Sequence, residues 1–229
     1  MKKLSVPFVG IIAGAILLSS CNVYQNANKS ERGAAIGVAG GAVAGGIIGK
    51  ISGNTALGSI IGAAVGGGAG YVIGKKMDKQ AEDIKEQVPD AKVQRVEEGI
   101  VVEFSSKVMF GFDQATLTDA SRNTLNNLIT ILNNYPETNL EVQGHTDNTG
   151  TEAYNNTLSV KRATSVADYL KANGISGNRL TIKGFGESAP KYDNNTEDGR
   201  QQNRRVEFLI TANEQMKADA AKEAQQQGQ

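Results

Sequence analysis

The sequence is poor in the residues that build most metal centres and disulfides. It contains one cysteine, one histidine and no tryptophan. A single cysteine cannot form an intrachain disulfide, and this pair falls short of the His- and Cys-rich ligand sets of zinc sites. The formal net charge is zero, so bulk electrostatics do not favour nucleic acid. We therefore expect neither a metal site nor a nucleic-acid partner.

The motifs of common catalytic and nucleotide-binding sites are also missing. Gly-x-Ser-x-Gly does not occur, and Ser159 falls inside a predicted helix with no sharp turn to expose it. Ser-Ala-Pro-Lys at 188–191 matches Ser-x-x-Lys, but its proline places it in a loop. The phosphate-loop pattern fails at Ile51, where Ser or Thr is needed. The sequence thus predicts a protein that is not an enzyme and holds no cofactor.

The amino-terminal residues resemble a bacterial lipoprotein signal. Lys2 and Lys3 give a positive start, and the apolar run 8–18 is too short for a comfortable membrane span. It leads into Leu-Ser-Ser-Cys at 18–21, which resembles a lipobox, where the chain is cut before the cysteine and the thiol is lipidated. We expect a signal peptide at 1–20, lipidation of Cys21 and a polar spacer at 21–32. An ordinary signal with a chance cysteine is the alternative.

Two runs of glycine at every fourth position follow, and we call them the glycine ladder. This period keeps the glycines near one helix face, and small residues at that spacing let helices pack closely in lipid. We expect a membrane-associated helical hairpin at 33–75, with a flexible linker as the alternative; whether it spans a bilayer stays open. The ladder consists of Gly33, Gly37, Gly41, Gly45, Gly49, Gly53, Gly58, Gly62, Gly66, Gly70 and Gly74.

A charged, helix-favouring stretch after the ladder predicts a helical stalk at 76–90, ended by Pro89. From 91 to 213 the composition is that of a globular domain. We expect a hairpin at 92–104 turning at Glu98-Gly99, and strands at 139–144, 179–185 and 204–210. The segment 186–203 looks polar and irregular, and 214–229 looks like a polar tail, loose or partly helical.

Two helices are predicted between these strands. Thr118 can cap the first, whose apolar residues recur at helical spacing. The second covers about 152–173, with Gly174 after its end and Leu158, Val166 and Leu170 on its inner face. Strands alternating with helices give an α/β two-layer sandwich.

The residues after the strand at 139–144 suggest a binding site. Asp147 follows the strand in a loop bracketed by Gly144 and Gly150, and Arg162 lies in the first half of the next helix. One carboxylate and one guanidinium bordering a cleft suit a small zwitterion, whose ammonium takes the acid and whose carboxylate takes the arginine. The alternative is that Asp147 and Arg162 form an internal salt bridge, or are solvated surface charges.

Four ordered segments resemble one known family. They are Gly-His-Thr-Asp-Asn-Thr-Gly at 144–150, the helical run 155–170, Gly-Phe-Gly-Glu-Ser-Ala-Pro at 184–190 and Asn-Arg-Arg-Val-Glu-Phe at 203–208. They are similar to the peptidoglycan-binding domain of the OmpA, Pal and MotB type. The whole layout is similar to glycine-zipper OmpA-family lipoproteins of the outer membrane.

The resemblance implies that the ligand is diaminopimelate of the peptidoglycan stem peptide, bound without catalysis. The family's acid corresponds to Asp147 and its arginine to Arg162, and His145 carries no ligand role. The supporting contacts that the family implies correspond to Asp113, Thr149, Asn155 and Arg204.

The resemblance also implies a location. Asn22 after the lipidated cysteine favours the outer membrane, with the carboxy-terminal domain in the periplasm. The expected partners are peptidoglycan and the lipid bilayer, and the expected function is to tether the outer membrane to the wall. The alternative is a scaffold or pore-associated protein that forms homo-oligomers through the ladder, with the wall domain as a tether.

Overall fold

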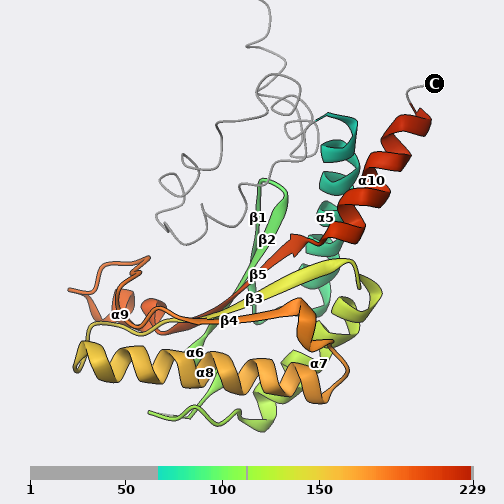
Figure 1. Cartoon of the computed structure of the whole chain (residues 1–229). Coiled ribbons are helices and arrows are strands. Elements are labelled where there is room, and N and C mark those ends of the chain that lie inside the picture. Colours follow the sequence, from blue (N-terminus) through green and yellow to red (C-terminus); the bar gives the residue numbers. More distant parts are fainter. Residues whose placement is uncertain (1–66, 112, 228–229) are drawn as a thin grey trace, which may run out of the picture.

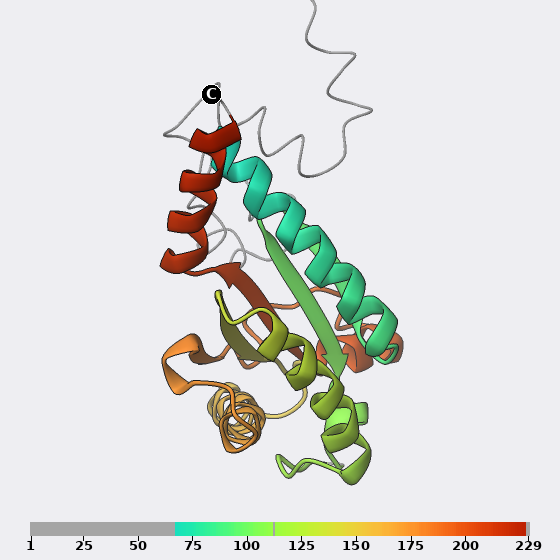
Figure 2. The same ribbon diagram turned by 90° about the vertical axis from the view of Figure 1, so that its right-hand side faces the viewer.

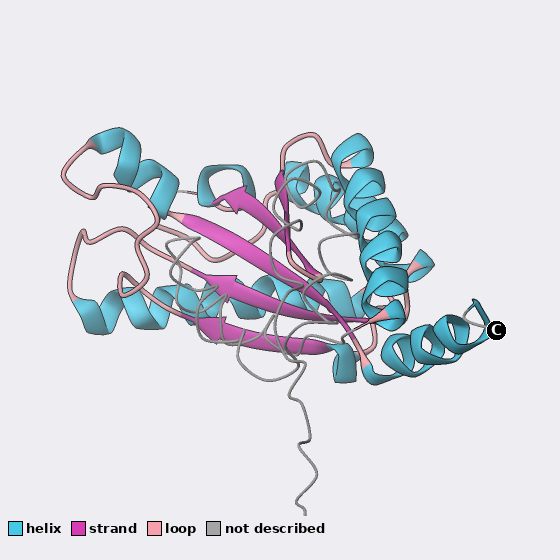
Figure 3. Cartoon of the chain, turned by 90° about the horizontal axis from the view of Figure 1, so that it is seen from above, coloured by secondary structure: helices cyan, strands magenta, loops and turns pink. Residues whose placement is uncertain are grey.

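Five strands form one mixed sheet in the computed structural model, which describes residues 67–111 and 113–227 (Figure 1). The strands are β1 (Lys92–Val96), β2 (Gly99–Ser105), β3 (Thr138–Gly144), β4 (Leu180–Gly184) and β5 (Arg205–Ala212). Their order is β1-β2-β5-β3-β4, with β3 and β4 parallel and the other described neighbours antiparallel. Seen from above, they make one twisted sheet (Figure 3).

The hairpin predicted at 92–104 is confirmed, with Val96 opposite Gly99. Its turn falls at Glu97-Glu98 and not at the predicted Glu98-Gly99. Glu97 takes a left-handed conformation with φ 48, which closes a two-residue turn one position earlier.

Three long helices pack on one face of the sheet: α5 (Gly68–Gln87), α7 (Asp119–Asn134) and α8 (Glu152–Ala172). The alternation of strand side chains puts Val102, Phe104 and Phe208 into the core beneath them. The rings of Phe104 and Phe208 meet edge to face, 5.5 Å between centroids. The predicted two-layer sandwich is therefore confirmed.

The two predicted helices begin and end as their capping residues indicated. Thr118 precedes α7 and accepts a hydrogen bond from the Ser121 amide at 3.1 Å. Gly174 follows α8 with φ 97, the conformation that ends many helices. Val166 and Leu170 are buried as predicted, whereas Leu158 is half-buried and lines the cleft described below.

Helix α5 corrects the predicted division between ladder and stalk. It runs unbroken from Gly68, so the last two ladder glycines share one helix with residues 76–87. Met77, Ala81 and Ile84 are buried in the core, and Asp78 pairs with Arg95 of β1 at 2.8 Å. The expected stalk is thus a packed part of the domain, because its apolar stripe covers the sheet.

The segment predicted as a polar tail, loose or partly helical, is helical and also packed. Residues Glu214–Gln227 form helix α10, which lies beside α5 (Figure 2). Met216 and Ala220 are fully buried, and a Cβ added at Gly68 would lie 2.9 Å from Cβ of Ala224. Small residues on both helices allow this close approach, so the tail completes the core instead of trailing from it.

The segment 186–203 contains a helix that the sequence analysis did not predict. Helix α9 (Glu197–Asn203) begins after Thr196, whose hydroxyl accepts from the Gly199 amide at 3.0 Å. The signal was present, since Thr196 is followed by two acids in the first turn, a favoured start. A one-turn helix, α6 (Ser106–Met109), also follows β2 directly.

The signal peptide, Cys21, the spacer and the ladder up to Gly66 lie outside the described residues. Within 67–111 and 113–227, no helix combines the length and the apolar character needed to cross a membrane. In the same ranges, no group of three or more His, Cys, Asp or Glu side chains could hold a metal ion.

Gly144 ends β3 where helix α8 lies closest to the sheet. A Cβ there would stand 2.1 Å from the carbonyl oxygen of Ser159. We expect Gly144→Ala to lower the free energy of unfolding by about 2–3 kcal/mol, because a helix backbone must move. Gly177→Ala is the matched control, since its Cβ would meet only Lys171 Cε at 3.6 Å. Urea unfolding followed by circular dichroism measures both, and equal stabilities would contradict this packing.

Candidate ligand-binding site

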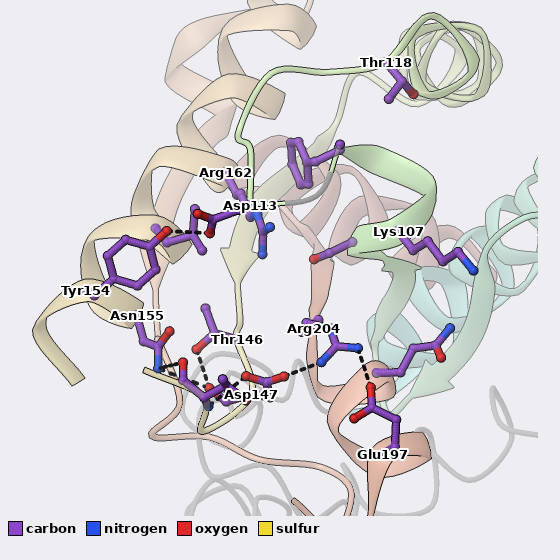
Figure 4. Close-up of a pocket in the computed structure, with 16 residues that line it drawn as sticks. Lys107, Asp113, Thr118, Thr146, Asp147, Tyr154, Asn155, Arg162, Glu197 and Arg204 are labelled. Atoms are coloured by element: carbon purple, nitrogen blue, oxygen red, sulfur yellow. Dashed lines mark hydrogen bonds and ion pairs between the residues drawn. The ribbon is translucent and has the colours of Figure 1, made fainter. Parts of the chain in front are cut away.

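One cleft collects all six residues that the sequence analysis proposed for ligand binding. Its volume is about 760 Å³, within the range of about 300–1,000 Å³ typical of ligand pockets. The residues come from the loop after β3, the first half of α8, the segment after α6 and the position between α9 and β5 (Figure 4). They are Asp113, Asp147, Thr149, Asn155, Arg162 and Arg204.

Asp147 is held rigidly at the end of β3. Its side chain is buried, and Oδ1 accepts from the Thr149 amide at 2.9 Å while Oδ2 is paired with Arg204. The preceding residue, Thr146, donates its amide to Gly186 O at 2.9 Å and its hydroxyl to Asp147 O at 2.9 Å. The carboxylate therefore faces the cleft in one fixed orientation.

Arg162 is buried on α8 and presents its guanidinium to the cleft. Its Nε donates to Gln114 O at 3.0 Å, and its guanidinium carbon lies 5.3 Å from the ring centre of Phe110. Neither terminal nitrogen makes a hydrogen bond to another described residue. Burial lowers the pKa of Arg162 from its ordinary value, and the nearby Asp113 carboxylate acts in the opposite direction. A positioned guanidinium with its fork open suits a carboxylate ligand.

Asp147 and Arg162 do not pair with each other among the described residues. The partner of Asp147 is Arg204, which also pairs with Glu197 at 3.2 Å. An internal Asp147–Arg162 salt bridge, one alternative left open by the sequence, is therefore absent. Burial acts to lower the pKa of Arg204, but its hydrogen bonds to Asp147 and Glu197 outweigh that effect and raise it.

Asn155 and Thr149 shape the loop that carries Asp147. The Asn155 amide nitrogen lies 3.3 Å from Asp147 O, 3.1 Å from Thr149 O and 2.6 Å from Glu187 Oε2. These contacts hold the loop against the first turn of α8. The side chain of Asn155 therefore holds the loop through hydrogen bonds, while Thr149 is exposed at the rim of the cleft.

Asp113 lies on the opposite wall, with a left-handed backbone at φ 55. Its Oδ1 accepts from the Tyr154 hydroxyl at 2.5 Å, and this hydrogen bond raises the pKa of Tyr154. The contact joins the segment after α6 to the start of α8 (Figure 4). Tyr154 was not predicted; its aromatic ring in the first turn of the helix after Asp147 was the available signal.

Lys107 and Glu197 also line the cleft and were not predicted. Glu197 belongs to the helix that was read as irregular, where the two acids after Thr196 could have indicated it. Hydrogen bonds from Arg200 and Arg204 lower the pKa of Glu197. Nothing in the sequence indicated that Lys107 lines a cleft, because a helix of one turn such as α6 is too short to show a periodic pattern.

Arg204, which ends α9, and Arg205, which begins β5, lie on opposite sides of the backbone. Arg204 faces the cleft, whereas Arg205 is fully buried on the sheet face away from α8. The Arg205 Nε donates to Glu207 Oε1 at 2.6 Å, and its terminal nitrogens donate to Asn203 O at 3.1 Å and Ala189 O at 3.3 Å. Arg204 thus contributes to the cleft, whereas Arg205 contributes to the buried framework of the sheet.

His145 is fully buried and lies flat against Phe185, with 5.2 Å between ring centres and 7° between planes. Neither ring nitrogen has a hydrogen-bond partner within the described ranges 67–111 and 113–227. Burial, and then Arg205 and Lys191, hold the pKa of His145 well below its usual range. The imidazole is therefore neutral and stacks on Phe185.

His145 should make folding sensitive to acid. Its folded-state pKa lies below the unfolded value near 6.5, so protons bind preferentially to the unfolded chain as pH falls through that value. Between pH 7.5 and 5.0 this costs up to about 2 kcal/mol of stability. We expect His145→Phe, which keeps the stacking, to lose correspondingly less over that interval. Urea unfolding at both pH values tests this; identical losses for the two proteins would contradict it.

Comparisons with known proteins find two matching families. Residues 109–204 match the OmpA family, and residues 1–78 match the YMGG-like Gly-zipper family. The probable lipoprotein YiaD of Escherichia coli K12 is 34% identical over 218 residues, covering 92% of this chain and 99% of that protein.

Other relatives match about half of the chain. The outer membrane porin F of Pseudomonas fluorescens is 44% identical over 115 residues, covering 50% of this chain and 35% of that protein. The peptidoglycan-binding protein ArfA of Mycobacterium tuberculosis is 41% identical over 103 residues, covering 45% of this chain and 32% of that protein. The chain thus spans about a third of the length of these two relatives.

A similar solved structure is the cell wall anchor of the T6SS from Pseudomonas aeruginosa. It superposes with a TM-score of 0.52 at 30% identity, covering 59% of this chain and 96% of that one.

Proposed function

Because this chain belongs to the OmpA family and carries a YMGG-like Gly-zipper segment, we propose that its cleft binds peptidoglycan without covalent chemistry. Its relatives include a protein named as peptidoglycan-binding and a structure described as a cell wall anchor. None of the relatives reported above is named as an enzyme. The protein would then hold the wall by binding alone.

The open guanidinium of Arg162 is the observation that carries this proposal. It is buried, oriented by Gln114 O and Phe110, and its terminal nitrogens lack a partner among the described residues. A ligand carboxylate would complete this arrangement through a bidentate pair. Asp147, on the loop across the cleft, would accept an ammonium from the same ligand.

Diaminopimelate of the stem peptide offers both groups. The free end of its side chain carries an amine and a carboxylate on one carbon. Thr149 and Asn155 would shape the loop around the amine, and Asp113 would border the carboxylate side beside Arg162. Arg204 would act from the β5 side of the same cleft.

We further propose that the protein is anchored to the outer membrane through lipids on Cys21, with this domain in the periplasm. The support is the lipobox-like sequence at 18–21 and the long match to a probable lipoprotein. A single acyl chain does not anchor a protein stably. A lipidated amino-terminal cysteine would carry more than one chain and so meet this need. The cleft would then tether the outer membrane to the wall.

Sedimentation of the detergent-solubilised protein with purified sacculi tests the wall-binding proposal. We expect the protein to pellet with sacculi and free meso-diaminopimelate to release it. Pimelic acid is the matched competitor, with the same carbon chain and no amines, and should release little. Protein that stays in the supernatant, or equal release by both competitors, would argue against the proposal.

A further inference from the structure

Arg204 lies between two carboxylates at the edge of the cleft (Figure 4). Its NH1 pairs with Asp147 Oδ2, and its NH2 lies 3.2 Å from Glu197 Oε1. The other oxygen of Asp147 already accepts from the Thr149 amide at 2.9 Å. Both oxygens of Asp147 therefore have a partner within the protein.

The two charged residues of the proposed zwitterion site, Arg162 and Asp147, thus differ in how they are paired. Arg162 presents a guanidinium whose terminal nitrogens have no partner among the described residues, so a carboxylate can bind without displacing anything. Asp147 is covered by a resident cation, Arg204. An incoming ammonium must compete with that guanidinium for one carboxylate.

Glu197 is placed to receive Arg204 when this happens. It lies in the first turn of α9, where Oε2 accepts from Arg200 NH2 at 2.7 Å while Oε1 faces Arg204. Arg200 is itself held by Asn194 O at 2.9 Å. Arg200 thus fixes Glu197 through one oxygen and leaves the other available. The Arg204 side chain is 35% exposed, so it has room to move.

Resting on the proposed function, we propose that Arg204 is the resident counter-ion of Asp147, that the ligand ammonium displaces it, and that Glu197 is a positioning residue that keeps Arg204 paired afterwards. Without Glu197, the displaced guanidinium would stay unpaired beside the new ammonium. Glu197 would thereby favour the bound state through Arg204 and without touching the ligand.

Titration calorimetry of meso-diaminopimelate into the full-length protein in detergent tests this with a double-mutant cycle. Glu197→Gln should weaken binding about two- to fivefold, the range expected for a partly exposed ion pair. In an Arg204→Ala background, the same substitution should change nothing. Asp198→Asn is the matched control, because Asp198 lies in the same first turn and contacts Gln202 at 2.8 Å; it should bind like the wild type.

The cycle separates the possible outcomes. The proposal would be overturned if Glu197→Gln bound with wild-type affinity. It would also be overturned if Glu197→Gln lost no more affinity than the control Asp198→Asn. An equal loss in both backgrounds would also overturn it, since Glu197 would then act on the ligand directly. If the wild type does not bind meso-diaminopimelate, the proposed function fails as well; failure of this inference alone leaves wild-type binding intact.

Discussion

Arg205→Ala should lower the free energy of unfolding by about 3–5 kcal/mol, because it removes one partner of a buried ion pair. Both side chains of the pair are almost fully buried, at 0% and 1% exposure for Arg205 and Glu207. After the change, the nearest described cation to Glu207 is Lys191, at 3.9 Å. Oε2 of Glu207 already lacks a hydrogen-bond partner in the described part of the chain, so the carboxylate would be left poorly compensated. Urea unfolding followed by circular dichroism measures the loss.

An exposed arginine supplies the control. The Arg122 side chain is 47% exposed and its partner Asp119 is 98% exposed, so Arg122→Ala should cost about 1 kcal/mol or less. Charge and residue type are the same in the two variants; what differs is the burial of the ion pair. Similar losses of stability in both would contradict the structural role assigned to the Arg205–Glu207 pair.

Asp147→Ala and Arg162→Ala should each abolish most binding to sacculi. Each change leaves the ligand's opposite charge in the cleft without its partner, at a cost of about 2–5 kcal/mol. That corresponds to a loss of affinity of roughly 30-fold or more. Sedimentation with purified sacculi over a range of protein concentrations measures it.

Matched controls lie on the same helix as Arg162. Lys161→Ala and Asp168→Ala remove exposed charges on α8 that do not line the cleft, and we expect both to bind like the wild type. Circular dichroism checks that all four variants are folded. Folded Asp147 and Arg162 variants that bind as well as these controls would remove the basis of the site.

Local chemistry explains why much of the fold could be predicted. Caps such as Thr118 and Gly174 act on the neighbouring backbone, and alternation or helical spacing reports which side of an element is buried. Predicting that Asp147 follows a strand and that Arg162 lies in the next helix required only the order of these elements along the chain and one crossover connection. That order brings Asp147 and Arg162 into one cleft, which also contains the four residues that only the family resemblance implied.

What could not be predicted depends on contacts distant in sequence. The insertion of β5 between β2 and β3 is a choice among pairings that sequence periodicity does not distinguish. The burial of α5 and α10 depends on each helix covering the other and the sheet. Charged, helix-favouring sequences fit a free helix as well as a packed one, so these two segments were predicted as stalk and tail.

The partner of Asp147 was missed for the same reason. Arg204 reaches Asp147 because β5 lies beside β3, with Gly144 paired to Val206. The sequence analysis placed both residues in one cleft, but it could not show that the acid is already paired while Arg162 is open. That difference in pairing is the feature from which the role of Glu197 was inferred.

A crystal structure of the protein with meso-diaminopimelate bound tests the central claim most directly. The account predicts that a ligand carboxylate lies on the terminal nitrogens of Arg162, with the amine of the same carbon within hydrogen-bonding distance of Asp147. A ligand held elsewhere, or in this cleft with its carboxylate on Lys107 or Arg204 and Arg162 left empty, would contradict it.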